Sequence, residues 1–153
     1  MDSSTSQIII RKVIKDDLIA IKSLLDNVSL PSVDIEKHLL NFYVLENEGN
    51  IVGTIGMELY GDTALLRSLA VKKKYQKKGY GHMLYQALIS RAKKADVNNI
   101  YLLTETAEEF FTKKGFKKIA REYAPLAIKQ TYEYSTLCPE GAVCMVKLLR
   151  VEN

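Results

Sequence analysis

The chain has 153 residues, of which 47% are hydrophobic and 26% charged, and this composition is typical of a soluble globular domain. A formal net charge of +4 favours anionic partners but is too small to indicate a nucleic-acid-binding protein. The polar start, MDSSTSQ, does not resemble a signal peptide, and the sequence contains no apolar run of about 20 residues. We therefore expect a cytoplasmic protein that does not bind membranes.

The first half of the chain predicts a strand, two helices and a three-stranded meander. Residues 1–6 are polar and are expected to form a flexible tail before one domain over residues 7–150. Asp16 or Asp17 is placed to cap the first helix. Periodicity and turn residues place these elements at 8–13, 16–28, 32 or 34 to 40, 42–48, 51–60 and 63–71.

The second half predicts alternating helices and strands. An apolar stripe at helical spacing indicates a long amphipathic helix that begins near Gly79. The expected elements are 79–96, 99–104, 106–114, 116–120, 124–130 and 142–149. The order β-α-α-β-β-β-α-β-α-β-α-β predicts an α/β fold (an α+β mixed sheet) in a single domain, with helices on the faces of the sheet.

A lysine-rich segment separates the third meander strand from the long helix. Five lysines occur within residues 72–78, directly before Gly79 and Gly81. The first turn of a helix has unpaired N–H groups and the positive end of the helix dipole, and glycines let a phosphate approach the backbone. We therefore expect a phosphate-bearing ligand at residues 76–82. For the lysines alone, a solvated loop or a nucleic-acid patch is the alternative.

The known phosphate motifs narrow the choice of ligand. No Walker GxxxxGK[ST] motif is present, and the sequence after Gly81 lacks the third glycine of the dinucleotide fingerprint. The segment instead reads Q-x-x-G-x-G from Gln76, five residues after the strand ending Leu69-Ala70-Val71. Downstream, residues 107–116 read A-x-x-F-F-x-x-x-G-F. Together these motifs resemble the GNAT superfamily of N-acetyltransferases.

This resemblance implies the GNAT acyl-CoA N-acyltransferase fold, acetyl-CoA as acetyl donor, and no metal. Backbone N–H groups of the Gln76–His82 loop would bind the pyrophosphate, and the pantetheine arm would pair along Leu69–Val71. The residues expected to bind the cofactor are Leu69, Ala70, Val71, Gln76, Lys77, Lys78, Gly79, Tyr80, Gly81, His82 and Phe111.

A narrower resemblance concerns LLRSLAV, YLLTETAEEFFTKKGF and YSTLCPEGAVCMVKLL. These segments look like amino-acid N-acetyltransferases of the N-acetylglutamate synthase type, and even more like the GNAT subfamily associated with arsenic-resistance operons. The resemblance implies a small-molecule amine acceptor, namely a small amino acid or an antimetabolite such as arsinothricin or phosphinothricin.

Direct acetyl transfer calls for an oxyanion donor and for groups that move protons. The backbone N–H of Val71 is the candidate oxyanion donor. The tyrosine that GNAT enzymes commonly use as the acid falls on Phe111, which cannot donate a proton. Tyr123, Tyr132 or a water would then serve, or the thiolate would leave unassisted. Phe111 itself would pack against the pantetheine or in the core.

Two charged residues in strands are candidates for acceptor chemistry. Glu58 lies near the centre of the meander and is the candidate base, with a surface glutamate as the alternative and Glu105 as second choice. Arg67 interrupts an apolar strand, where its planar guanidinium would bind an acceptor carboxylate. The alternative is a salt bridge from Arg67 to Glu58 or another carboxylate. Ser68 and Thr104 complete the expected substrate-binding set.

The remaining reactive residues carry weaker signals. Cys138 and Cys144 are interpreted as structural cysteines, His38 as a surface residue, and His82 as a possible phosphate contact. Two other functions stay open: acetylation of a protein or peptide amine, and a catalytically degenerate acyl-CoA sensor. A homodimer formed through the late strands is possible, and no nucleic acid is expected as partner.

Overall fold

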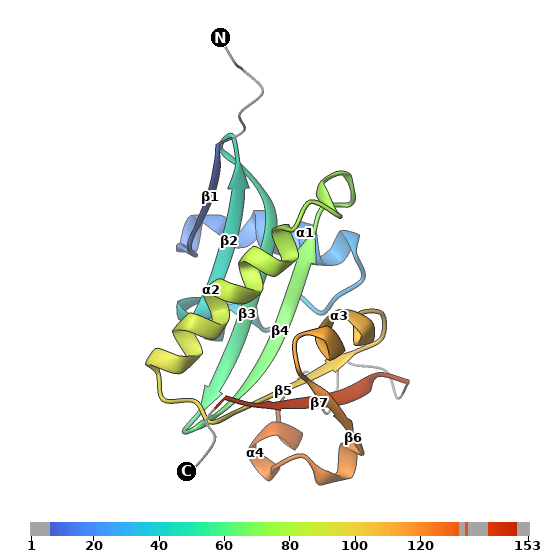
Figure 1. Ribbon diagram of the computed structural model, residues 1–153. Coiled ribbons are helices and arrows are strands. Elements are labelled where there is room, and N and C mark those ends of the chain that lie inside the picture. Colours follow the sequence, from blue (N-terminus) through green and yellow to red (C-terminus); the bar gives the residue numbers. More distant parts are fainter. Residues whose placement is uncertain (1–6, 132–133, 135–140, 150–153) are drawn as a thin grey trace. The chain divides into compact units, whose positions relative to one another are not determined.

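The computed structural model describes residues 7–131, 134 and 141–149, so the expected tail at 1–6 lies outside the described residues. A mixed seven-stranded sheet with the strand order β1-β2-β3-β4-β5-β7-β6 forms the framework (Figure 1). Its strands are β1 (Ile8–Lys12), β2 (Phe42–Asn47), β3 (Asn50–Tyr60), β4 (Thr63–Val71), β5 (Asn99–Thr104), β6 (Lys117–Ile119) and β7 (Val143–Leu148). The predicted α/β mixed sheet is confirmed.

Helices of two kinds connect the strands. The α-helices are α1 (Leu18–Asn27), α2 (Tyr80–Lys94), α3 (Glu108–Lys113) and α4 (Leu126–Lys129). Short 3-10 helices are η1 (Lys15–Asp17), η2 (Ile35–Asn41), η3 (Lys73–Tyr75) and η4 (Arg121–Tyr123). Each predicted element is present within a few residues, and the second predicted helix has 3-10 geometry. Among the described residues, no helix is both long and apolar enough to cross a membrane.

The chain forms two compact units. The described part of unit 1 comprises residues 7–57 and 68–90, and that of unit 2 comprises 58–67, 91–131, 134 and 141–149. In unit 1, β2 pairs antiparallel with β1 on one side and β3 on the other. In unit 2, β4 pairs in parallel with β5, and β7 pairs antiparallel with both β5 and β6.

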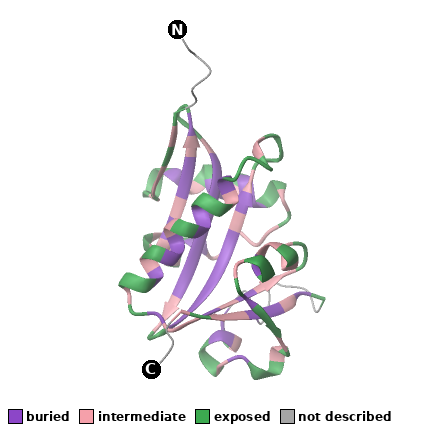
Figure 2. Cartoon of the chain, viewed as in Figure 1, coloured by how far each residue is buried: buried purple, intermediate pink, exposed green. Residues whose placement is uncertain are grey.

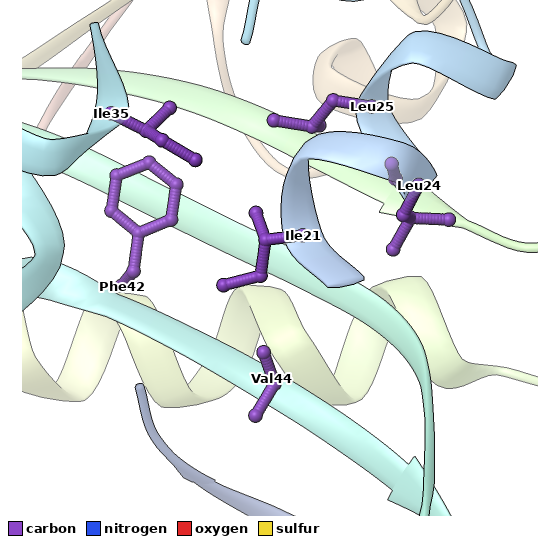
Figure 3. Packing of buried hydrophobic residues seen from close by; sticks show 7 residues of the cluster. Ile21, Leu24, Leu25, Ile35, Phe42 and Val44 are labelled. Atoms are coloured by element: carbon purple, nitrogen blue, oxygen red, sulfur yellow. The ribbon is translucent and has the colours of Figure 1, made fainter. Parts of the chain in front are cut away.

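The core of unit 1 lies between the sheet and α1. Its buried residues interdigitate across α1, η2, β2 and β4 (Figure 3): Ile21, Leu24, Leu25, Ile35, Phe42, Val44 and Ala70. The helix α1 and the first part of α2 lie on opposite faces of β2 and β3 (Figures 1 and 3). Both faces of these strands are therefore covered, and Figure 2 shows long buried stretches along them.

Gly56 on β3 lets an aromatic ring lie directly on the strand. A Cβ built on Gly56 would come within 2.3 Å of Cε1 of Phe42, closer than carbon atoms can approach. The Phe42 side chain is fully buried and belongs to the unit 1 core. A residue without a side chain is therefore required at Gly56 for this packing.

The Asp17 side chain makes no capping hydrogen bond to α1 itself but caps η1, the 3-10 turn that leads into α1, so the expected cap lies one turn earlier than predicted. The Asp17 carboxylate instead accepts two hydrogen bonds from Arg11, at 2.8 and 2.9 Å, and one from the Ile14 N–H at 2.8 Å. Arg11 also donates to Glu46 on β2 at 2.6 Å. Asp17 is buried, and these contacts lower the pKa of its carboxyl group. The Arg11 side chain therefore links β1 to η1 through Asp17 and to β2 through Glu46.

The core of unit 2 forms where β4, β5 and β7 meet η4 and α4. Its buried residues are Leu65, Ala124, Ile128, Tyr134 and Cys144. Tyr60 and Tyr101 pack against this cluster from β3 and β5. The parallel pairing of β4 with β5 is short, running from Thr63 opposite Asn99 to Leu65 opposite Tyr101.

Candidate functional site

A backbone kink lies in the middle of β4. Ser68 has a φ of +62°, a conformation that residues other than glycine rarely adopt and that costs on the order of 1 kcal/mol or more. Such strain inside a buried strand interrupts its regular hydrogen bonding and is often found at functional sites. The kink directly precedes Leu69–Val71, the segment predicted to bind the cofactor. The sequence contains no signal for it, because Ser68 is not a glycine.

The basic loop after β4 is closed by its own hydrogen bonds. The Lys72 N–H donates to the Val52 carbonyl at 2.8 Å, which extends the strand pairing by one residue. Gln76 Nε2 donates to the Val71 carbonyl at 2.9 Å. The Gln76 side chain therefore ties the loop back to the end of β4. Since this side chain is engaged with Val71, we expect the backbone after Gln76 to bind the ligand.

The loop then turns through two left-handed residues into α2. Lys77 has a φ of +66° and Gly79 a φ of +84°. The first helical hydrogen bond runs from the Met83 N–H to the Gly79 carbonyl at 3.1 Å, so the N–H groups of residues 80–82 form the open first turn. A Cβ at Gly79 would meet no atom within 4 Å, so space exists in front of this turn.

The charges around this turn suit an anionic group. Lys72, Lys73, Lys74, Lys77 and Lys78 are all exposed. The positive end of the α2 dipole adds to their potential. The residues present therefore fit the pyrophosphate of a CoA ester.

An aromatic pair anchors the same loop to the sheet. The Tyr80 ring is buried at the start of α2, and its hydroxyl accepts a hydrogen bond from Asn47 Nδ2 at 3.4 Å. Tyr75 of η3 stacks on Tyr80 with ring centroids 6.3 Å apart and an interplanar angle of 23°. The Lys74 ammonium lies over the Tyr75 ring, 5.6 Å from its centroid. These contacts were not expected from the sequence.

In unit 2, Glu58 of β3 and Arg67 of β4 form a buried ion pair. Arg67 Nη1 donates to Glu58 Oε2 at 2.8 Å, and the two side chains are 0% and 1% exposed. The Tyr60 hydroxyl donates to the other carboxylate oxygen, Oε1. The surface alternative for Glu58 is therefore excluded, and the salt-bridge alternative for Arg67 describes the structure. Direct contact of either group with an acceptor requires local opening of the segments that cover them.

The other predicted site residues of unit 2 have structural contacts of their own. Phe111 is buried on α3, and its ring packs edge-on against Phe110 and Phe116, with centroids 5.0 and 5.4 Å apart. Thr104 Oγ1 accepts a hydrogen bond from the Ala107 N–H at 2.9 Å at the entry to α3. The core role of Phe111 is thus present, and its contact with a pantetheine stays a prediction.

The alternative proton donors and bases differ in exposure. The Tyr123 side chain is 74% exposed, and Glu105 and His82 are also exposed, whereas His38 is partly buried. Tyr132 lies outside the described residues.

Cys144 is a buried free thiol on β7, and Cys138 lies outside the described residues. Cys144 Sγ lies 4.0 Å from the Tyr134 hydroxyl, which also donates to the Arg121 carbonyl. Burial raises the pKa of the Cys144 thiol and raises the pKa of Tyr134 to about 12. A buried thiol with a raised pKa is a poor nucleophile, which supports a structural role for Cys144.

Comparisons with known proteins identify a family and relatives that match most of this chain. The family model described as "Acetyltransferase (GNAT) domain" matches residues 38–118. An uncharacterised N-acetyltransferase of Chlorobaculum tepidum is 31% identical over 121 residues, which cover 76% of each chain. An amino-acid acetyltransferase of Neisseria meningitidis is 26% identical over 100 residues, or 64% of this chain and 23% of that protein. The chain thus spans about a quarter of this last relative.

Among solved structures, the N-acetylglutamate synthase of Neisseria gonorrhoeae complexed with coenzyme A and N-acetyl-glutamate is similar in fold. The TM-score is 0.81 at 22% identity, and the match covers 96% of this chain and 36% of the synthase. At this level of identity, the comparison establishes a shared fold.

Proposed function

Because this chain belongs to the GNAT family of acetyl-CoA-dependent acetyltransferases, we propose that it moves the acetyl group directly to the amino group of a small amino acid or an amino-acid-like antimetabolite. The observation that carries the proposal is the strand–loop–helix junction over Leu69–His82. Its left-handed Gly79 opens onto free space at the start of α2. The names of the amino-acid acetyltransferase relatives support the acceptor class.

In this proposal, the first turn of α2 holds the pyrophosphate. The first turn of an α-helix carries N–H groups that suit an anion, and the exposed Lys77 and Lys78 directly precede this turn. Bound acetyl-CoA would supply an activated thioester: the amine would attack the carbonyl carbon of the acetyl group, and the C–S bond would break to release CoA as the thiolate. Gln76 acts through its bond to the Val71 carbonyl, which fixes the loop rather than the ligand.

The segment after the Ser68 kink would hold the thioester. Ser68 has a left-handed backbone within β4, and irregularities of this kind often free backbone groups from strand pairing, so we assign the groups that follow it to a ligand. We assign the Val71 N–H to the developing oxyanion, where a preorganised donor stabilises the transition state. Leu69 and Ala70 would pair with the pantetheine arm, and Phe111 would border it.

The ion pair in unit 2 would serve the acceptor. Glu58 would take a proton from the attacking amine, directly or through a water. Its two oxygens already accept bonds from Tyr60 and Arg67, which fix its orientation. Arg67 Nη1 donates to Glu58 Oε2, and we assign its planar guanidinium to the acceptor carboxylate because the fork of donors matches the geometry of a carboxylate. Ser68 and Thr104 complete the proposed acceptor site.

The deciding experiment is release of the CoA thiol from acetyl-CoA without an acceptor, with each common amino acid, and with phosphinothricin. Mass detection would identify each acetylated product. Turnover with one amino-acid-like acceptor supports the proposal. Turnover only with peptides would favour a protein acetyltransferase instead. Binding of acetyl-CoA without turnover on any amine would favour a sensor and overturn the enzymatic assignment.

A glycine substitution tests the proposed pyrophosphate site at the start of α2. Gly79→Ala places a Cβ on a backbone with a φ of +84°, which L-residues adopt at a cost of about 1–2 kcal/mol. We expect roughly tenfold weaker binding of CoA, with little change in acceptor KM at saturating acetyl-CoA. Gly141→Ala is the matched control, because Gly141 has no positive φ and a Cβ there meets no atom within 4 Å. Equal CoA affinity in both variants would contradict the proposed binding of the pyrophosphate at Gly79.

A further inference from the structure

The loop before α2 carries more positive charge than the pyrophosphate needs. Five exposed lysines lie within residues 72–78, whereas a pyrophosphate diester carries about two negative charges. Lys77 and Lys78 lie directly before the first turn of α2 and can serve that group. Lys72, Lys73 and Lys74 lie a turn earlier, in and before η3. They remain unexplained by the proposed pyrophosphate site.

Lys74 is distinguished within this group by a chain of contacts. Its ammonium lies 5.6 Å from the centroid of the Tyr75 ring, within the range of a cation–π contact. Tyr75 stacks in turn on Tyr80, the first residue of α2. Asn47 at the end of β2 donates to the Tyr80 hydroxyl, and both residues are buried. The sheet therefore fixes, through two rings, the position of one lysine beside the helix end.

A lysine held in this way loses less side-chain entropy on binding than a freely rotating one. A single fixed positive charge next to a pyrophosphate site suits a second phosphate monoester in the same ligand. CoA carries such a group at the 3′ position of its ribose, with a charge of about −1.5 to −2 at neutral pH.

We propose that Lys74, positioned by Tyr75, Tyr80 and Asn47, forms a second anion subsite that binds the 3′-phosphate of CoA. The enzyme would therefore distinguish CoA from 3′-dephospho-CoA. This inference rests on the proposed use of acetyl-CoA, but it concerns binding and can be measured without turnover.

The test compares dissociation constants for CoA and 3′-dephospho-CoA by titration calorimetry. We expect the wild-type protein to bind CoA about tenfold more tightly, a ratio that shrinks at high salt. Lys74→Met should weaken CoA binding alone and reduce the ratio to about threefold or less. Lys73→Met, which removes the same charge from the same turn, should weaken both ligands equally and leave the ratio unchanged.

Two further variants separate positioning from charge. Tyr75→Phe keeps the ring and should keep the ratio, whereas Tyr75→Leu should lower it although Lys74 is intact. Equal affinity of the wild type for both ligands would overturn the subsite while leaving the acetyltransferase proposal in place. An unchanged ratio in Lys74→Met would also overturn it. Failure of both ligands to bind would overturn the subsite and the proposed cofactor together.

Discussion

Arg67 and Glu58 neutralise each other inside unit 2, with 2.8 Å between Nη1 and Oε2 and with at most 1% of either side chain exposed. Removing two charges from water is costly, and the attraction between them recovers that cost only with good geometry. The Tyr60 hydroxyl supplies a further bond to the carboxylate. The effect of the pair is therefore to hold the Glu58 carboxylate in a fixed orientation inside unit 2.

Loss of one partner of this pair should be worse than loss of both. Arg67→Met leaves the Glu58 carboxylate buried without its cation, so we expect the free energy of unfolding to fall by about 3–5 kcal/mol. The double variant Glu58→Met/Arg67→Met should recover most of that stability and lose activity. Urea denaturation measures the first effect. A double variant no more stable than Arg67→Met would contradict this account.

Gly56 should tolerate no side chain while Phe42 is present. In Gly56→Ala the new Cβ would lie within 2.3 Å of the Phe42 ring, so strand or ring must shift, and we expect a loss of about 3 kcal/mol. Thermal unfolding measures this loss of stability in Gly56→Ala, with Gly141→Ala as the control. The double variant Gly56→Ala/Phe42→Leu should be less destabilised than the sum of its single variants. Strict additivity would mean that the ring does not cause the loss.

The Arg11–Asp17 contact should stabilise the protein only where Asp17 is ionised. The bonds from Arg11 lower the pKa of Asp17 below its usual value of 3.8. The unfolded chain therefore binds the proton at higher pH than the folded chain does. The resulting stability is fully present above pH 3.8 and is lost as the pH falls through the folded pKa.

The stability difference between the wild type and Asp17→Asn should accordingly be about 2 kcal/mol at pH 7 and should shrink under acid. Unfolding by urea at a series of pH values measures this difference. Asp16→Asn, which alters an exposed neighbour, is the control. A difference that stays constant down to pH 2 would show that the ionised Asp17 is not the source.

The Cys144 thiol should be inert in the folded protein. Burial raises its pKa, so little thiolate forms at pH 8 and little reagent can enter. In a Cys138→Ala background, we expect no labelling by a disulfide reagent over minutes, and full labelling in denaturant. Rapid labelling of the native protein would indicate that Cys144 is accessible and would reopen a chemical role for it.

Local pattern was sufficient for the element order, because alternating hydrophobicity, helical spacing and turn residues between the meander strands are each read over a few consecutive residues. The Gln76–Gly81 motif was found for the same reason, since its chemistry lies in consecutive residues. The Glu58–Arg67 pair was foreseen as an alternative, because strands of known length limit which residues can face each other. Whether Arg67 contacts an acceptor could not be decided from the sequence and stays a prediction.

Other features depend on tertiary structure. The left-handed conformation of Ser68 is strained and can be maintained only by the folded sheet. A serine in the sequence does not indicate such a conformation. Asp17 caps η1 rather than α1, and its carboxylate also binds Arg11, six residues earlier, a contact that no local pattern indicates. The Asn47–Tyr80 contact joins positions 33 residues apart, which no local period could connect.

The insertion of β7 between β5 and β6 has a consequence for synthesis on the ribosome. Ile100 pairs with Lys147 and Lys118 pairs with Met145, so both strands bond to a strand that is made after them. Until residues 143–148 leave the exit tunnel, the edges of β5 and β6 that will receive β7 are open to other chains. Nascent unit 2 therefore exposes two open strand edges before β7 is made, and we expect chains that stop upstream of residue 143 to aggregate.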